Sequence, residues 1–156
     1  MKLAERVHRI KPSPTFAAAA KAAAMRARGI EVVSFAQGEP DFDTPANIKE
    51  AAYKAIGAGI TKYTPAAGFD DLKDAIIQKF KKDNGLTYNR SQILASAGAK
   101  LCIYNLAQVL FEAGDEVIVP APYWVSYTDI VLLMDAQPVV IPTTEEQGFR
   151  ISPQQL

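Results

Sequence analysis

The stretch SQILASAGAKLCIYNLAQVLFEAGDEVIVPAPYWVSYTDIVLLMDAQPVVI, residues 91–141, contains the pattern that decides the fold. Short apolar runs alternate in it with segments of helical periodicity. The predicted strands are 92–96, 115–119 and 138–141, and the predicted helices are 100–111 and 124–134. Parallel strands joined by helices form right-handed crossovers, and helices then cover both faces of the sheet. The stretch therefore predicts an α/β fold with three α/β/α layers and a mainly parallel sheet.

An N-terminal arm and several helices precede this stretch. Ser13 as N-cap, Pro14 at the first helical position and Gly29 after the last turn are typical helix boundary signals. Asn84-Gly85 is a second C-terminal stop. The predicted elements are helices over 14–28 and 45–56, a helix that ends at residue 84, and a strand over 31–35.

The composition excludes several classes of protein. Among 156 residues, 17 Lys and Arg balance 17 Asp and Glu, which argues against a nucleic-acid or membrane-surface partner. No apolar run approaches the roughly 18 residues of a spanning helix. The Ala-rich N-terminal segment loosely resembles a signal sequence, but Lys21 interrupts its apolar run, so we expect a cytoplasmic protein. With only Cys102 and His8, we expect no disulfide framework, no Ser/His/Asp triad and no metal site.

The last residues contain a helix start. Ser152, Pro153 and Gln155 form the pattern of a capping box, and the chain stops at Leu156. An isolated turn of this length is not stable. This pattern predicts that the chain is the front portion of a longer protein.

Two loops follow predicted parallel strands and are candidates for a binding site. Gly98, Ala99 and Lys100 stand between a strand and a helix, where backbone N–H groups and the helix N-terminus attract a phosphate. Trp124 follows the next strand and offers a flat face for a planar ring. Both loops lie at the carboxyl edge of the sheet, where ligands bind in open α/β folds. The alternative for residues 98–100 is that their small side chains only permit a tight turn. The alternative for Trp124 is a tryptophan of the core or of an interface.

Two further segments have weaker signals. Glu39 and Asp41 form a pair of carboxylates that could act in acid–base chemistry, although such acids commonly cap turns and helices. Tyr63 is either an exposed hydroxyl donor or a loop anchor.

Taken together, five motifs resemble the class I aminotransferases of the pyridoxal-phosphate fold type I superfamily. The likeness is to the bacterial aspartate aminotransferase branch, including the members that also accept prephenate. The motifs are KPSPT at 11–15, GEPDF at 38–42, KYT at 62–64, GAK at 98–100 and PYWVSY at 122–127.

The resemblance implies a cofactor, pyridoxal 5'-phosphate, and residues that bind it. The backbone of Gly98 and Ala99, together with Lys100, would hold the phosphate region. Trp124 would stack on the pyridine ring, and Tyr63 would reach the phosphate of the other subunit in a homodimer.

The resemblance also implies residues that contact the substrates, an amino acid and a 2-oxo acid. Gly38 would lie beside the substrate carboxylate, where a side chain would clash, and Trp124 would contact the substrate. Thr15 and Lys100 resemble residues that contact the distal carboxylate. An N-terminal arm and helix over 1–44 would belong to a small domain and a dimer contact, and 45–156 would begin the cofactor-binding large domain.

The family's catalytic groups have no counterpart in this sequence. The Schiff-base lysine, the acid that faces the pyridine nitrogen and the arginine for the α-carboxylate are expected beyond Leu156. The whole protein would therefore be a transaminase, with aspartate or glutamate as the expected donor, whereas the 156-residue chain alone is predicted to be inactive. The alternative is a non-catalytic module of the same fold that binds a phosphate ligand or dimerises.

Overall fold

The computed structural model describes residues 2–156, which divide into two compact units. One unit combines the residues up to Gly38 with Lys100–Leu156, and the other is Glu39–Ala99. The boundary predicted between residues 44 and 45 stays a prediction.

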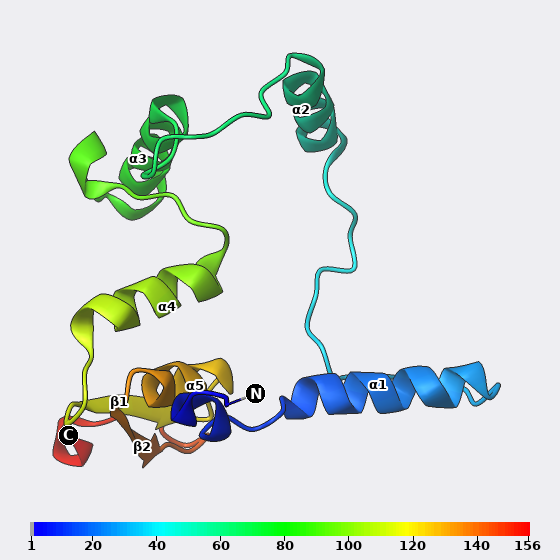
Figure 1. The fold of residues 1–156 in the computed structure, drawn as a ribbon, viewed down its shortest axis with the longest axis vertical. Coiled ribbons are helices and arrows are strands. Elements are labelled where there is room, and N and C mark those ends of the chain that lie inside the picture. The colour runs from blue at the N-terminus through cyan, green and yellow to red at the C-terminus, as the bar shows by residue number, and fades with distance from the viewer. Residues whose placement is uncertain (1) are drawn as a thin grey trace. The chain divides into compact units, whose positions relative to one another are not determined.

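The first unit contains most of the predicted α/β pattern. Its elements are η1 (Glu5–His8), α1 (Pro14–Ala27), α4 (Ala99–Leu110, which begins at the junction of the units), β1 (Glu116–Ala121), α5 (Ser126–Leu133), β2 (Gln137–Pro142) and η3 (Pro153–Gln155) (Figure 1). The helices predicted over 14–28, 100–111 and 124–134 and the strands over 115–119 and 138–141 are confirmed, with shifted ends.

Strands β1 and β2 are parallel, as predicted, and α5 is the connection between them. Their register runs from Glu116 opposite Gln137 to Ala121 opposite Pro142. Helix α5 packs against both strands and against η1 (Figure 1). Within residues 2–156 the sheet has two strands, so the α/β class is confirmed with a smaller sheet than the sequence predicts.

The core of this unit lies where α4 meets α5. Ala107 of α4 is only 2% exposed and packs with four buried residues of α5 and the segment that follows it. These residues are Ile130, Val131, Met134 and Ala136. The small side chain of Ala107 leaves room for the larger residues opposite it. The N-terminal arm is fixed on the same helix, because Arg9 pairs with Asp135 just after α5.

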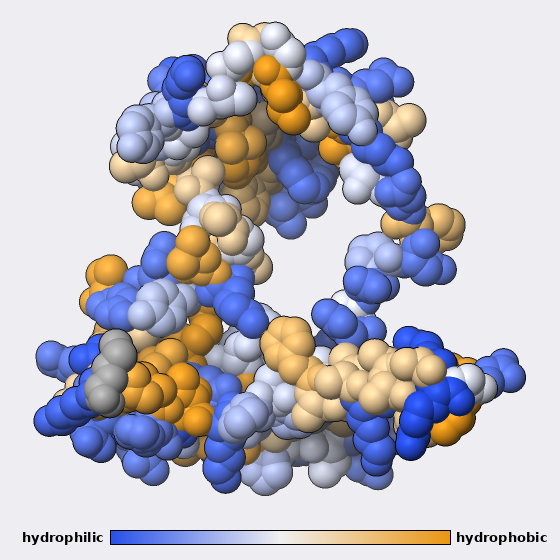
Figure 2. Space-filling view, turned by 45° about the vertical axis from the view of Figure 1, so that its right-hand side comes forward, coloured by the Kyte–Doolittle hydropathy of each residue, from blue (hydrophilic) through white to orange (hydrophobic). Residues whose placement is uncertain are grey.

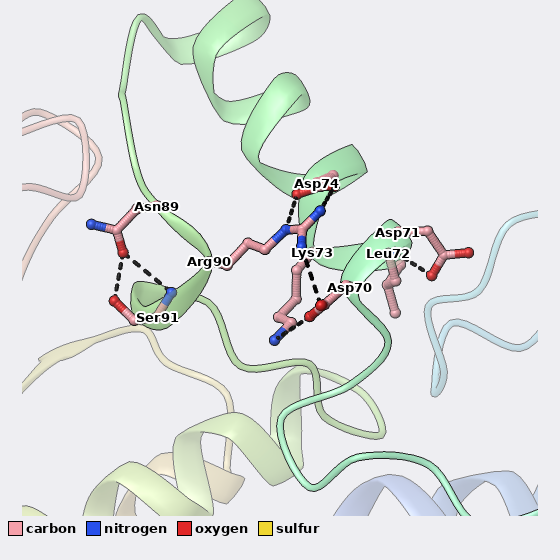
Figure 3. Close-up of polar contacts among 8 residues, drawn as sticks. All are labelled: Asp70, Asp71, Leu72, Lys73, Asp74, Asn89, Arg90 and Ser91. Atoms are coloured by element: carbon pink, nitrogen blue, oxygen red, sulfur yellow. Dashed lines mark hydrogen bonds and ion pairs between the residues drawn. The ribbon is translucent and has the colours of Figure 1, made fainter.

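The second unit consists of α2 (Ala46–Gly57), α3 (Asp70–Asn84) and η2 (Arg90–Gln92). The stop predicted at Gly85 is confirmed, because this residue is left-handed, with φ +69°. Figure 3 shows Arg90 reaching back to the first turns of α3. Its Nε donates to Asp74 Oδ1 over 2.6 Å and its Nη1 to Asp70 Oδ2 over 3.1 Å. These contacts connect η2 to α3.

Two predicted strands are wrong. Residues 31–35 form no regular element and pair with no strand of the described chain. They lie along α1, where Arg26 Nη2 donates to the carbonyl of Val32 over 3.1 Å. The stretch 92–96 begins in η2, whose cap is Asn89, and the backbone N–H of Ala95 donates to Ala67 O over 3.0 Å. An apolar run becomes a strand only where a neighbouring strand completes its hydrogen bonds.

The contacts of Arg90 predict how the stability of the second unit depends on pH. Asp70 has its pKa lowered from 3.8, mainly by Lys73 and then by Arg90, and Arg90 also lowers the pKa of Asp74. A lowered folded pKa adds stability above the unfolded value and loses it as pH falls through the folded value. Unfolding midpoints measured from pH 7 down to pH 2 should therefore decrease below about pH 4, by the small amount that exposed ion pairs contribute.

The unfolding midpoint of the variant Arg90→Gln should decrease less over the same pH range. Arg28→Gln is the matched control, because Arg28 belongs to the first unit and pairs with no carboxylate of the described residues. Equal pH profiles for Arg90→Gln and the unaltered protein would contradict a contribution of the Arg90 contacts.

Large apolar side chains reach the surface in both units, and Figure 2 shows hydrophobic residues in orange at the surface. In the first unit they include Val109 and Leu110 of α4 and Ile118 of β1. Within residues 2–156, no helix combines the length and apolar character that crossing a bilayer requires.

Candidate functional site

The first unit contains a cavity of about 470 Å³ with mixed polar and apolar walls. It is lined by Ser13, Thr15, Phe16, Ala36, Gln37, Gly38, Lys100, Trp124, Val125, Ser126 and Asp129. This volume lies within the range of small-molecule sites, roughly 300–1,000 Å³.

Local structure places these residues around the cavity. Helix α1 begins at Pro14, so Thr15 lies in its first turn, next to the N-cap residue Ser13. Residues 32–36 lie against α1, and Gln37 and Gly38 follow them in the chain. Lys100 is the second residue of α4, and Trp124 stands in the connection from β1 to α5. Segments distant in the sequence thus meet at the ends of three helices.

The cavity offers one cation, one anion and two exposed aromatic side chains, Phe16 and Trp124. Lys100 and Asp129 are the two lining residues that carry a charge. Lys100 Nζ lies 4.5 Å from the centroid of the Trp124 ring. The indole packs edge-on against Tyr127, with 5.5 Å between centroids and an interplanar angle of 90°. The remaining polar lining residues are Ser13, Thr15, Gln37 and Ser126.

Four of the predicted site residues line this one cavity: Thr15, Gly38, Lys100 and Trp124. Gly98 and Ala99 directly precede Lys100 in the chain and belong to the second unit. Gly98 has φ +90°, and a Cβ there would stand in open space. Tyr63 also belongs to the second unit, and its side chain is fully exposed.

Comparison with known proteins gives the family. Residues 30–156 match the sequence profile of the family described as aminotransferase class I and II. The chain belongs to this family. The aspartate/prephenate aminotransferase of Nitrosomonas europaea is 53% identical to it over 156 residues. An aspartate aminotransferase of Bacillus subtilis is 47% identical, also over 156 residues.

Solved aminotransferase structures share the fold. Aspartate aminotransferase from Thermus thermophilus with maleate has a TM-score of 0.94 and 42% identity over 99% of this chain and 41% of that one. The enzyme from Rhizobium meliloti has a TM-score of 0.93, with 42% identity, over 99% of this chain and 39% of that one. These likenesses confirm the predicted fold, that of the fold type I aminotransferases. The chain spans 39% of the length of the Nitrosomonas relative and 40% of the Bacillus one.

Several residues that line the cavity were not predicted from the sequence. Ser13 is predicted as a helix cap; it occupies the N-cap position, but its side chain makes no capping hydrogen bond and it lines the cavity instead. Gln37 directly precedes the motif GEPDF, and Asp129 stands two residues after PYWVSY. Only that proximity could have indicated these two residues. Ser126 lies within PYWVSY and Phe16 directly follows KPSPT, and neither has a signal of its own.

The acid–base interpretation of the GEPDF motif gains no support from the structure. Neither Glu39 nor Asp41 lines this cavity. The neighbouring Asp43 has a structural role: it accepts from the backbone N–H of Thr44 over 2.7 Å and pairs with Lys49 of α2. Lys49 and then the Thr44 N–H lower the pKa of the Asp43 carboxyl group. Among residues 2–156 no group of three or more His, Cys, Asp or Glu side chains could together hold a metal ion.

Gly38 offers a test that separates folding from binding. A Cβ at this position would meet no atom within 4 Å, so Gly38→Ala should leave the unfolding midpoint unchanged. The added methyl group would instead narrow the cavity and weaken binding of a carboxylate such as maleate by about tenfold. Titration calorimetry and a thermal melt measure the two effects. Gly57→Ala, at the end of α2, is the matched control and should not change the affinity.

An equal affinity of the Gly38→Ala variant and the unaltered protein for maleate would contradict the predicted place of Gly38 beside the carboxylate. A lower melting temperature would instead indicate a structural role for this glycine.

Proposed function

We propose that this chain supplies cofactor- and substrate-binding residues of a pyridoxal-phosphate-dependent aminotransferase that acts on a dicarboxylic amino acid, aspartate or glutamate, and a 2-oxo acid. The observation that carries the proposal is the single cavity formed by Thr15, Gly38, Lys100 and Trp124. Relatives named aspartate aminotransferases, matched over the whole chain, support it. Because the chain spans 39% of the Nitrosomonas relative, the proposal concerns the whole protein.

The donor set of the cavity suits pyridoxal phosphate, which combines a planar ring with an anionic group. The Trp124 side chain is 43% exposed and can cover one face of such a ring. The ammonium group of Lys100 lies at the N-terminal end of α4, where free backbone N–H groups, including that of Ala99, also favour an anion. The open space at Gly98 lets an anion approach the backbone closely.

Each residue of the cavity has a separate task in this proposal. When bound, pyridoxal phosphate carries the amino group between the substrates and stabilises the negative charge that develops on the substrate. Trp124 excludes water from one face of the ring. Thr15 donates a hydrogen bond to the distal carboxylate, and Lys100 attracts it by charge. Gly38 leaves space for the other carboxylate. These contacts explain a preference for dicarboxylic substrates.

The exposed Tyr63 supports a second part of the proposal. A hydroxyl group at full exposure is free to reach another molecule. We propose that the protein acts as a homodimer in which Tyr63 binds the phosphate in the partner's site. The small-domain and dimer role of residues 1–44 belongs to the same proposal.

Amino transfer measured with the whole protein tests the proposal. With pyridoxal phosphate present, amino transfer to 2-oxoglutarate should be faster from aspartate than from alanine. Thr15→Val removes the hydroxyl group while keeping the shape of the side chain, and it should lower kcat/KM for aspartate about tenfold with a smaller effect on alanine. The 156-residue chain alone should show no amino transfer. Ligand binding without any amino transfer by the whole protein would favour the non-catalytic module.

A further inference from the structure

We infer that Trp124 is a positioning residue for Lys100: its indole holds the ammonium group at the cavity wall and thereby sets the preference for ligands with a second negative charge. This inference deepens the proposed function and rests on it. It gives Trp124 a task that is distinct from covering the ring of the cofactor.

The contact between the two residues has the geometry of a cation–π interaction. Lys100 Nζ lies 4.5 Å from the centroid of the indole, within the roughly 6 Å over which such pairs attract. Trp is the aromatic residue that gives the strongest interaction of this kind. Among the residues that the structure describes, Lys100 forms no ion pair, and Asp129 of the same cavity does not approach it closely enough to form one. The indole is therefore the group that attracts the ammonium.

The indole itself is held in place. Tyr127, in the first turn of α5, packs edge-on against it with 5.5 Å between centroids. A lysine side chain, in contrast, has a flexible stem and loses much rotamer freedom when a ligand fixes it. An ammonium that already lies on a fixed aromatic surface loses less of that freedom on binding. The packing of Trp124 thus reduces the entropic cost of binding a carboxylate at Lys100.

The ammonium of Lys100, held on the indole of Trp124, favours the binding of a dicarboxylate over that of a monoanion. A dicarboxylate gains an ion pair with the positioned ammonium, whereas a monoanion of the same shape has no second charge to place there. If Trp124 only covered a ring or filled space, its loss would weaken both ligands by the same factor. The ratio of the two affinities therefore reports the positioning role and not the structural one.

Titration calorimetry on the full chain tests this ratio with maleate and with its monomethyl ester, which lacks one charge. Trp124→Leu should lower the preference for maleate about threefold to tenfold, and Trp124→Phe should retain part of it. In the Lys100→Met background the same Trp124→Leu change should leave the ratio unaltered, as a double-mutant cycle requires. An equal loss for both ligands on Trp124→Leu would overturn the inference. Failure of the unaltered protein to bind maleate would count against the proposed function instead.

If the unaltered protein does not bind maleate, tryptophan fluorescence measured without any ligand still tests the inference. Trp124 is the only tryptophan among these 156 residues. Removing the ammonium from its face by Lys100→Met should change the tryptophan emission. Lys54→Met, which removes a charge from α2, is the matched control and should leave the emission unchanged. An emission spectrum of Lys100→Met identical to that of the unaltered protein would overturn the inference.

Discussion

Replacing Gly68 by valine should destabilise the unit of residues 39–99 by about 3 kcal/mol, the sum of backbone strain and overpacking. Gly68 has φ +93°, a region that β-branched residues rarely enter. A Cβ at this position would also stand 2.8 Å from Ala95 Cβ. The neighbouring hydrogen bond from Ala95 N to Ala67 O would have to lengthen to relieve that contact. Chemical denaturation followed by circular dichroism measures the loss.

Gly59→Val is the matched control for this prediction. Gly59 also has a positive φ, +75°, but a Cβ there would meet no atom within 4 Å. Its replacement should therefore cost only the backbone strain, about 1–2 kcal/mol. The excess loss at Gly68 measures its close approach to Ala95. Equal losses at both positions would show that this approach contributes nothing to stability.

Replacing Lys100 by methionine should weaken the binding of maleate by about tenfold to a hundredfold, which corresponds to a lost hydrogen bond to a charged group. Methionine keeps the unbranched stem and removes the charge that faces the cavity. Titration calorimetry measures the affinity, and a thermal melt confirms that the variant is folded.

Two further variants are the controls for the effect of Lys100→Met on maleate binding. Lys100→Arg retains the charge and should keep part of the affinity. Lys54→Met removes a charge from α2, outside the cavity, and should keep all of it. An unchanged maleate affinity of Lys100→Met would contradict the place given to Lys100 in the proposed site.

The sequence predicted those elements that have local signals. The signals at Pro14 and Gly85 mark a helix start and a helix end, and both are found there because they depend only on nearby residues. The strands at 31–35 and 92–96 were wrong because a strand depends on a partner elsewhere in the chain. Apolar character does not specify that partner.

The same distinction holds for the candidate site. The order of predicted strands and helices indicated that Lys100 and Trp124 lie together, and both line the cavity. The reason given for Lys100 was wrong in part, because the strand at 92–96 that it was to follow is not formed. Thr15 and Gly38 could be added only through the family resemblance, because no local pattern brings residues so distant in sequence together. Asp129 was missed because an acid in the first turn of a helix is common for reasons unrelated to binding.

The ion pair between Arg9 and Asp135 has a consequence for synthesis on the ribosome. The two residues are 126 positions apart in the chain. At roughly 5–20 residues per second, translation takes on the order of ten seconds to pass from one to the other. During that interval Arg9 lacks the partner with which it pairs in the folded protein. The contact between the N-terminal arm and the end of α5 therefore forms only after Asp135 has been synthesised.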